Sequence, residues 1–253
     1  MAKISACIIS FNEEKKIEDC LKSLAGIADE IIVVDSNSTD NTVDIAKKFT
    51  PHVYTQKFLG YGKQKNFATE KASHDWIINL DCDERLSDEL KKSIMEIKDS
   101  IDTADVWYMK RKTYYIYRWL DHCWYPDKKI RLYNKNRARW DDADVHENIN
   151  IGNLISKTLD GDILHYSFDS ISDHLKTIDK FTEIGANDLI RKNKSFNVFS
   201  PCAHASWTFI KLYLLKKGFM DGFAGLIVAT LSFMHVFVKY SKAIIKRKQG
   251  DSL

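Results

Sequence analysis

Three acidic residues, Asp81, Asp83 and Glu84, follow a strongly apolar run in the segment WIINLDCDERL. Neighbouring carboxylates repel one another and resist desolvation, so this arrangement calls for a positive partner. Successive side chains alternate along a strand, so we expect Asp81 and Asp83 to point the same way and Cys82 to face the opposite side. Two convergent carboxylates form a hard oxygen site of the kind that Mg²⁺ or Mn²⁺ binds. The same spacing occurs in solvated acidic turns, so spacing alone leaves both interpretations open.

The elements around this segment are expected to place its acids at one edge of a sheet. Four short apolar runs, KISACIIS, EIIVV, HVYTQKF and WIINLD, alternate with helical patterns in the first 85 residues. The alternation predicts an α/β fold with a parallel sheet and helices on both faces. A Ser or Thr of STDNT is expected to cap the helix after the second strand. Ligands of such sheets bind beyond the carboxyl ends of the strands, where Asn12, Asp35 and Asp81 fall.

The rest of the chain divides into a β-rich part and a helical part. Residues 86–100 have the spacing of an amphipathic helix, and residues 105–166 are rich in strand-forming and aromatic residues that we expect to complete the sheet. From residue 171 the pattern is helical. We also expect Arg131 and Trp124 to line the pocket for a second substrate, although an equally open interpretation of the aromatic segment around Trp124 is a core and lid.

The most hydrophobic segment, residues 222–238, has no charged residue over seventeen positions. A bilayer span takes roughly 20 apolar residues, so a span, a helix at the membrane surface and a helix covering the folded domain all fit this segment. Five basic residues between 239 and 248 favour an anionic cytoplasmic leaflet. We expect peripheral attachment rather than a span.

Composition excludes several classes of protein. The chain of 253 residues is 44% hydrophobic and 29% charged, with a net charge of +3, which is typical of a folded protein. Its five scattered cysteines favour free thiols in a reducing compartment, and no secretion signal is visible at the N-terminus. The first strand is not followed by a glycine-rich turn, which argues against a dinucleotide-dependent oxidoreductase or a nucleotidyltransferase. No basic stripe indicates nucleic-acid binding.

Several longer motifs together carry a resemblance to a known family. CIISFNEEKKIEDCLKSL, EIIVVDSNSTDNTVDIAKKF, GYGKQKNFA and WIINLDCDERLS, in this order, resemble the family 2 glycosyltransferases of the GT-A fold. WYPDKKIRLYN, DVHENI, GDILHYSF and KKGFMDGFAG extend the resemblance over nearly the whole chain, toward the subgroup similar to lipopolysaccharide core heptose β-1,4-glucosyltransferases. Most of that subgroup has glycine at Asn37 and alanine at Cys82. Asn tolerates the left-handed backbone conformation, and Cys82 is expected to face away from the site.

The resemblance implies roles for the residues that would bind a nucleotide sugar. Asp35 would accept from the nucleobase, with Asn12 and Glu13 near the nucleoside. Lys63 and Lys65, placed in a glycine-containing loop, would offset diphosphate charge. A pair of solvated surface lysines is the alternative interpretation.

A divalent metal, Mg²⁺ or Mn²⁺, is implied as cofactor. Asp83 would bind it directly, and Asp81 would hold the metal or the ribose. His165 would complete the metal shell or touch diphosphate, although a structural role for a histidine that ends a strand is equally open.

The acceptor half of the reaction is expected to depend on DVHEN. Inverting transfer needs a base that deprotonates the acceptor hydroxyl, and Glu147 occupies the position of the family's catalytic acid residue, with His146 as second choice. The resemblance thus implies an inverting transferase that moves a hexose, for instance glucose from UDP, to a lipopolysaccharide-core or other lipid-linked saccharide at the cytoplasmic face of the bacterial inner membrane. The alternative is an inactive protein that binds nucleotide sugars at the membrane.

The expected domains follow from this assignment. Residues 1–170 would form the catalytic domain, with a nucleotide-sugar half at 1–100 and an acceptor half at 101–170. Residues 171–253 would form a helical, membrane-associating extension.

Overall fold

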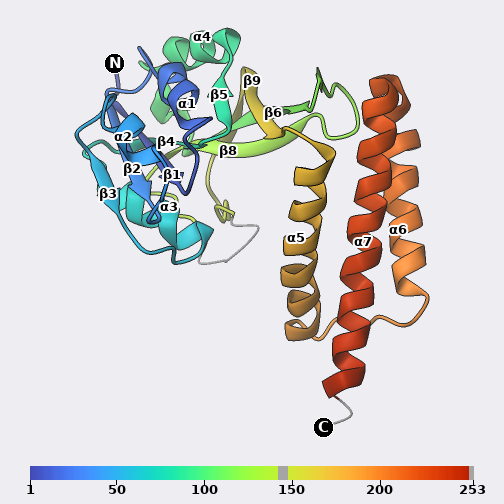
Figure 1. The fold of residues 1–253 in the computed structure, drawn as a ribbon. Helices are drawn as coiled ribbons and strands as arrows, with labels where there is room; N and C mark the ends of the chain where they lie inside the picture. Colours follow the sequence, from blue (N-terminus) through green and yellow to red (C-terminus); the bar gives the residue numbers. More distant parts are fainter. Residues whose placement is uncertain (142–147, 251–253) are drawn as a thin grey trace. The chain divides into compact units, whose positions relative to one another are not determined.

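The structure, a computed structural model, describes residues 1–141 and 148–250 and divides the chain into two compact units (Figure 1). We call Met1–Arg111 with Asp127–His165 the sheet unit, and Lys112–Pro126 with Tyr166–Leu253 the helical unit. The strands β6 and β9 run from the first unit into the second. The domain division expected at residue 170 stays a prediction; by compactness, the segment 112–126 groups with the helices.

The strands of the described residues form one mixed sheet in the order β3-β2-β1-β4-β8-β6-β9-β5, with β7 paired to β6. Strands β1 to β4 are parallel, whereas β8 runs antiparallel to β4 and β6, and β5 runs antiparallel to β9. The predicted α/β sheet is therefore confirmed, as is its completion by residues 105–166. The strands are β1 (Ile4–Ser10), β2 (Glu30–Asp35), β3 (Val53–Thr55), β4 (Trp76–Asp81), β5 (Glu84–Leu86), β6 (Val106–Tyr115), β7 (Arg118–Trp119), β8 (Asp127–Asn134) and β9 (Ser156–Phe168).

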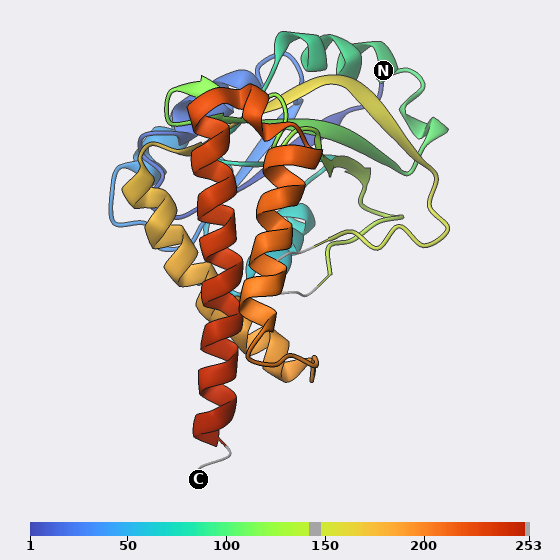
Figure 2. The ribbon, with the colours of Figure 1, turned by 90° about the vertical axis from the view of Figure 1, so that its right-hand side faces the viewer.

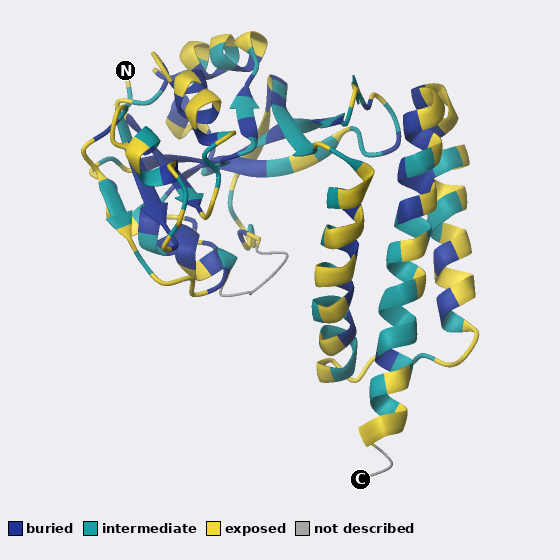
Figure 3. Cartoon of the chain, viewed as in Figure 1, coloured by how far each residue is buried: buried dark blue, intermediate teal, exposed yellow. Residues whose placement is uncertain are grey.

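Alternation along the central strands produces a core on each face of the sheet. In β1, Ile4, Ala6 and Ile8 belong to one buried cluster, while Cys7 packs in the other. Burying each large aliphatic side chain stabilises the fold by about 1.5–3 kcal/mol. The central strands are accordingly buried almost throughout (Figure 3). None of the five cysteines forms a disulfide, as expected.

The described residues of the sheet unit contain four α-helices, one of which has a side-chain cap at its start. Ser87 caps the helix after β5 by accepting from the backbone N–H of Leu90 at 3.2 Å. The helix after β2 begins at Thr42, and its N-cap residue is Asn41, which makes no side-chain cap hydrogen bond, so the expected Ser or Thr cap is wrong. The Thr42 hydroxyl instead donates to Asp40 at 2.5 Å. The helices are α1 (Ile17–Ser23), α2 (Thr42–Ala46), α3 (Tyr61–Glu70) and α4 (Asp88–Ile97), with a 3₁₀ turn at Ile101–Thr103.

The helical unit is built around one long helix, α7, which packs against both α5 and α6 (Figures 1 and 2). Its core joins Tyr115, Leu120 and Cys123 of the segment 112–126 to Leu212 and Val228. With the turn before it, α7 is long and apolar enough to cross a membrane, but a third of its most apolar window is buried inside the protein. The elements are α5 (Ile171–Arg191), α6 (Ser200–Ile210), the π-helical turn η2 (Lys211–Leu215), the 3₁₀ turn η3 (Gly218–Asp221) and α7 (Gly222–Gly250).

Candidate active site

The carboxyl ends of three parallel strands meet at one edge of the sheet, as the sequence predicts. In the register, Ser10 of β1 lies beside Asp35 of β2, and Ile9 lies beside Asp81 of β4. The residues that follow these strands are therefore neighbours, although about 25 or more positions separate each from the next.

Asp35 organises the loop after β2. Its side chain is 1% exposed, and it accepts hydrogen bonds from the hydroxyl of Ser10 at 2.9 Å and from the backbone N–H of Ser38 at 2.7 Å. Asn37, which lies between Asp35 and Ser38, has a φ of 63°, the left-handed conformation that asparagine tolerates. The Asn-for-Gly departure is thus compatible with the loop, and the nucleobase role of Asp35 stays a prediction.

Asn12 joins the loops after β1 and β2. Its backbone N–H donates to the Ser38 hydroxyl at 2.8 Å, and its side-chain oxygen accepts from the Thr39 N–H at 2.8 Å. The N–H of Glu13 donates to the hydroxyl of Thr42 at 2.7 Å. These bonds hold Asn12 and Glu13 at the strand edge, where the nucleoside is expected.

The two predicted diphosphate lysines lie on a helix rather than in a loop. Gly60, with a φ of 100°, ends the loop, and α3 begins at Tyr61, so the expected loop placement is wrong. Helical spacing then separates the two side chains: Lys63 is exposed, while Lys65 is 1% exposed. Diphosphate contact by either lysine stays a prediction.

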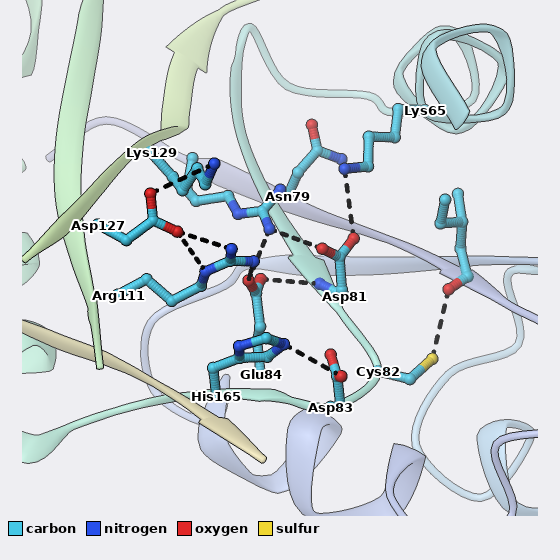
Figure 4. Close-up of polar contacts among 12 residues, drawn as sticks. Lys65, Asn79, Asp81, Cys82, Asp83, Glu84, Arg111, Asp127, Lys129 and His165 are labelled. Atoms are coloured by element: carbon cyan, nitrogen blue, oxygen red, sulfur yellow. Dashed lines mark hydrogen bonds and ion pairs between the residues drawn. The ribbon is translucent and has the colours of Figure 1, made fainter. Parts of the chain in front are cut away.

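Asp81 has two basic partners. Lys65 Nζ lies 3.3 Å from one carboxylate oxygen (Figure 4). Arg131 Nη2 lies 2.6 Å from the other. Burial raises the pKa of Asp81, but the charges of Arg131 and Lys65 outweigh it and hold that pKa well below its usual range. The carboxyl is one-third exposed, so an ionised acceptor remains available to a ligand.

Behind Asp81 lies a buried ion-pair network. Glu84, whose side chain is fully buried, accepts from Arg131 at 2.6 Å and from Arg111 at 3.2 Å. Arg111 also contacts Asp127 at 2.7 Å. The acids Asp81, Glu84 and Asp127 thus pair with Lys65, Arg111, Arg131 and Lys129, of which Lys129 lies 3.4 Å from Asp127.

Arg131 is 3% exposed, and its Nε has no hydrogen-bond partner. The sequence placed this residue in an acceptor pocket, whereas the structure uses its guanidinium to hold Asp81 and Glu84 together. Its strand, β8, is the antiparallel neighbour of β4, and no spacing in the sequence reveals that pairing.

Asp83 lies on the other side of the acidic turn. The strand stops at Asp81 and residues 82–83 form a turn, so the alternation assumed from sequence does not extend to Asp83. Asp83 points toward His165, with Oδ2 and Nε2 3.2 Å apart, whereas Asp81 points toward Lys65 (Figure 4). Cys82 faces the core as expected, with its Sγ 3.3 Å from the carbonyl oxygen of Ile9. The structure therefore brings together two of the three predicted metal ligands.

Several acidic side chains lie near Asp83 and affect the charge of Glu13. Burial and the charge of Asp83 raise the pKa of Glu13 to about 7, with smaller contributions from Asp40 and Asp81. In residues 1–141 and 148–250, no cluster of three or more His, Cys, Asp or Glu side chains is arranged to hold a metal. Two protein ligands suffice for Mg²⁺ or Mn²⁺ where substrate oxygens and water complete the shell. The carboxylate of Asp83 and the imidazole of His165 fit this requirement.

Sequence reasoning missed a group of residues that joins α3 to the site. The side chain of Asn66 bonds the backbone of Trp140 in both directions, at 3.0 and 3.2 Å. The indole N–H of Trp140 donates to Asn79 on β4 at 2.9 Å, and Lys65 lies 4.6 Å from the Trp140 ring centre. Asn66 of α3 and Asn79 of β4 are thus both joined to Trp140 by hydrogen bonds. Glu147 and His146, the predicted bases, lie outside the described residues.

The model of the family described as "Glycosyl transferase family 2" matches residues 5–164. The chain belongs to this family. A further match is an uncharacterized glycosyltransferase of Rickettsia typhi, 33% identical over 96% of this chain and 87% of that protein. Another is the lipopolysaccharide core biosynthesis glycosyltransferase LpsC of Rhizobium meliloti, 28% identical over 94% of this chain and 91% of that protein.

Among solved structures, S. aureus TarS (residues 1–349) in complex with UDP aligns with 95% of this family 2 protein. The match covers 91% of that chain at 16% identity and a TM-score of 0.49. The family match and the relatives show that the protein is a glycosyltransferase. Its mixed sheet with flanking helices agrees with the expected GT-A fold, and the sheet edge described above is its candidate active site.

Proposed function

We propose that the enzyme transfers a hexose, such as glucose, from a UDP-sugar with inversion to a lipopolysaccharide-core or other lipid-linked saccharide. The similarity to a lipopolysaccharide core biosynthesis glycosyltransferase supports this class of acceptor. Such an acceptor is held in a membrane, so the enzyme would work at the cytoplasmic face of the inner membrane.

The ionised Asp81 supports the binding of the donor. A carboxylate accepts hydrogen bonds without competing as a donor, so its one-third exposed oxygens suit the hydroxyl groups of a ribose. Lys65 and Arg131 keep this carboxylate charged and fix its direction. In this proposal Asp35, Asn12 and Glu13 bind the nucleoside beside it.

Asp83 and His165 would hold Mg²⁺ or Mn²⁺. Such an ion supplies Lewis-acid stabilisation to the nucleoside diphosphate as charge develops on the leaving oxygen. The charge balance of the turn supports this assignment. The carboxylate of Asp81 is already neutralised by two cations, whereas the ionic partner of Asp83 among the described residues is the His165 imidazole, and burial together with the charge of Asp83 raises the pKa of Glu13.

The acceptor hydroxyl would lose its proton to Glu147, with His146 as second choice. A base placed opposite the leaving group lets the oxygen attack the anomeric carbon from that side, which inverts its configuration. This assignment comes from the family motif and lies outside the described residues.

The Asp83–His165 contact is the observation that carries the proposal, because it brings together, at the edge of the sheet where the three parallel strands end, two side chains that would hold a cation. The test measures release of UDP from a panel of UDP-sugars with Mn²⁺ and a lipopolysaccharide-core acceptor. Asp83→Asn should abolish turnover, whereas Asp160→Asn, at an exposed acid on β9, should not change it.

Glu147→Gln separates catalysis from binding. Removal of a general base costs about 10²–10⁴ in rate, while affinity for the donor should persist. If the wild-type enzyme binds a UDP-sugar but neither transfers nor hydrolyses it in Mn²⁺, the protein is a binding protein and the proposal fails.

A further inference from the structure

The helical unit concentrates exposed apolar side chains at one end. From the end of α6 through η2 and η3 to the start of α7, eight large apolar side chains are exposed, from 37% at Leu226 to 68% at Phe223. Folded proteins rarely expose so many together without a partner. We call this set the apolar turn; its members are Trp207, Ile210, Leu214, Leu215, Phe219, Met220, Phe223 and Leu226.

The apolar turn carries positive charge and no exposed negative charge. Lys211, Lys216 and Lys217 are all exposed within it. The only acid between residues 192 and 250 is Asp221, whose side chain is fully buried. Its carboxylate is occupied by the backbone N–H groups of residues 121, 122 and 123, at 2.9, 3.2 and 2.9 Å. Nothing in this stretch therefore offsets the three lysines.

Apolar side chains interspersed with lysines are complementary to an anionic membrane surface, which has charged headgroups outside and acyl chains below them. Leu, Phe and Met side chains gain from burial among acyl chains, and Trp is favoured at the interface. Lysine stems can follow the apolar surface while their ammonium groups reach anionic headgroups. We propose that the apolar turn inserts into one leaflet of an anionic lipid bilayer and thereby docks the enzyme on the membrane.

The rest of α7 is unsuited to a span. In its second half Lys242 Nζ lies 2.9 Å from Asp179, and Lys246 contacts Glu183 and Asn187, all on α5. A spanning α7 would draw these charged contacts into hydrocarbon, which is costly. Membrane contact is thus confined to the apolar turn, and the basic residues 239–248 are not the anchor.

A second copy of the chain is a poorer occupant. A two-fold contact places the same patch on both partners, so the three lysines would face their own copies. Like charges brought together across an interface disfavour it. The inference rests on the proposed function only because that function gives the enzyme a reason to bind a membrane. The surface itself is defined by the exposed residues of the helical unit.

The test uses full-length protein and needs no sugar donor or acceptor, so its failure and that of the proposed function are distinguishable. In a Cys202→Ser background, an environment-sensitive dye is attached to Leu215→Cys or, as a matched control, to Phe199→Cys; the four native cysteines that remain are buried. Phe199 is 76% exposed and lies at the start of α6, outside the apolar turn. With vesicles of phosphatidylglycerol and phosphatidylethanolamine, the dye at 215 should shift to the blue and that at 199 should not.

Flotation with the same vesicles measures the contribution of each surface. Leu214→Ser/Leu215→Ser/Phe219→Ser should lower the partition coefficient at least about tenfold, whereas Val198→Ser/Phe199→Ser should leave it unchanged. Lys211→Glu/Lys216→Glu/Lys217→Glu should also lower it, whereas Arg247→Glu/Lys248→Glu should not. Circular dichroism and urea unfolding check that the variants are folded.

Three results would overturn the inference. The first is equal partition of the wild type and the apolar-turn variants. The second is loss of binding only in the 247/248 variant. The third is a dimer, seen by sedimentation in the absence of lipid, that the substitutions at 214, 215 and 219 dissociate.

Discussion

The two units bury their polar groups in opposite ways. The sheet unit keeps charges inside and pairs them with opposite charges, as in the contacts of Arg131 with Asp81 and Glu84. The helical unit balances its buried carboxylate, Asp221, with backbone N–H groups and surrounds His174 with aromatic rings. The first unit thus keeps fixed charge beside a ligand edge through ion pairs, whereas the second stabilises its buried carboxylate with backbone N–H groups and exposes apolar side chains.

Breaking the buried network of the sheet unit should have the largest effect. Glu84→Gln leaves Arg131 and Arg111 without their shared carboxylate, and the loss of one partner from a buried ion pair costs about 3–5 kcal/mol. Denaturant unfolding measures this cost. Asp160→Asn, at an exposed acid, should cost less than about 0.5 kcal/mol. Similar values for the two variants would show that the network contributes little to folding.

In the helical unit the corresponding change is Asp221→Ala. It leaves three backbone N–H groups and the Cys123 thiol without their acceptor, for an expected loss of about 3 kcal/mol. Asp221→Asn retains one acceptor oxygen and should lose roughly half as much. Equal unfolding free energies for both variants would mean that charge, rather than hydrogen bonding, stabilises this turn.

The helical unit should also respond to acid. Burial and the nearby charge of His235 lower the pKa of His174 from 6.5 to about 4. Because the folded pKa lies below the unfolded one, the stability is present above about pH 6.5 and is lost as the pH falls toward 4. Linkage predicts a loss of about 2 kcal/mol between pH 7 and pH 5. Urea unfolding at both pH values should show that His174→Gln removes this component.

A matched control for the acid response is His52→Gln, at an exposed position of the sheet unit. It should keep the acid sensitivity of the wild type. If His174→Gln keeps it too, His174 is not the group that titrates.

The smallest expected difference in unfolding free energy is between substitutions of the two lysines of α3. Lys65→Met removes a cation from Asp81 and from the ring of Trp140, so we expect a loss of about 1–2 kcal/mol. Lys63→Met changes an exposed side chain and should cost less than about 0.5 kcal/mol. Thermal unfolding of both variants tests the difference, and equal shifts would mean that the burial of Lys65 adds nothing.

Much of the fold could be predicted from sequence because it depends on local patterns. The apolar runs and their spacing indicated the four parallel strands, and the position of Asn12, Asp35 and Asp81 after three of them indicated the ligand edge. The left-handed conformation of Asn37 and the inward direction of Cys82 were anticipated from the properties of those residues.

The ion-pair network could not be predicted in the same way. Arg131 reaches Asp81 only because β8 lies antiparallel beside β4, a pairing between strands 46 residues apart at their closest ends that no local pattern encodes. Lys65 is buried because α3 already begins at Tyr61. The two glycines of GYG indicated a loop there, so the helix was not expected to include Lys65. The alternation assumed for Asp83 failed because the chain turns at residues 82–83.

We propose that Asp83 and His165, rather than the neutralised Asp81, form the cation site. The most direct test of this proposal is a titration with Mn²⁺ in the presence of UDP, followed by electron paramagnetic resonance, on wild type, Asp83→Ala and Asp160→Asn. The account predicts a bound Mn²⁺ ion in the wild type and in Asp160→Asn, and at least about tenfold weaker binding in Asp83→Ala. Equal Mn²⁺ affinity in all three proteins would contradict it.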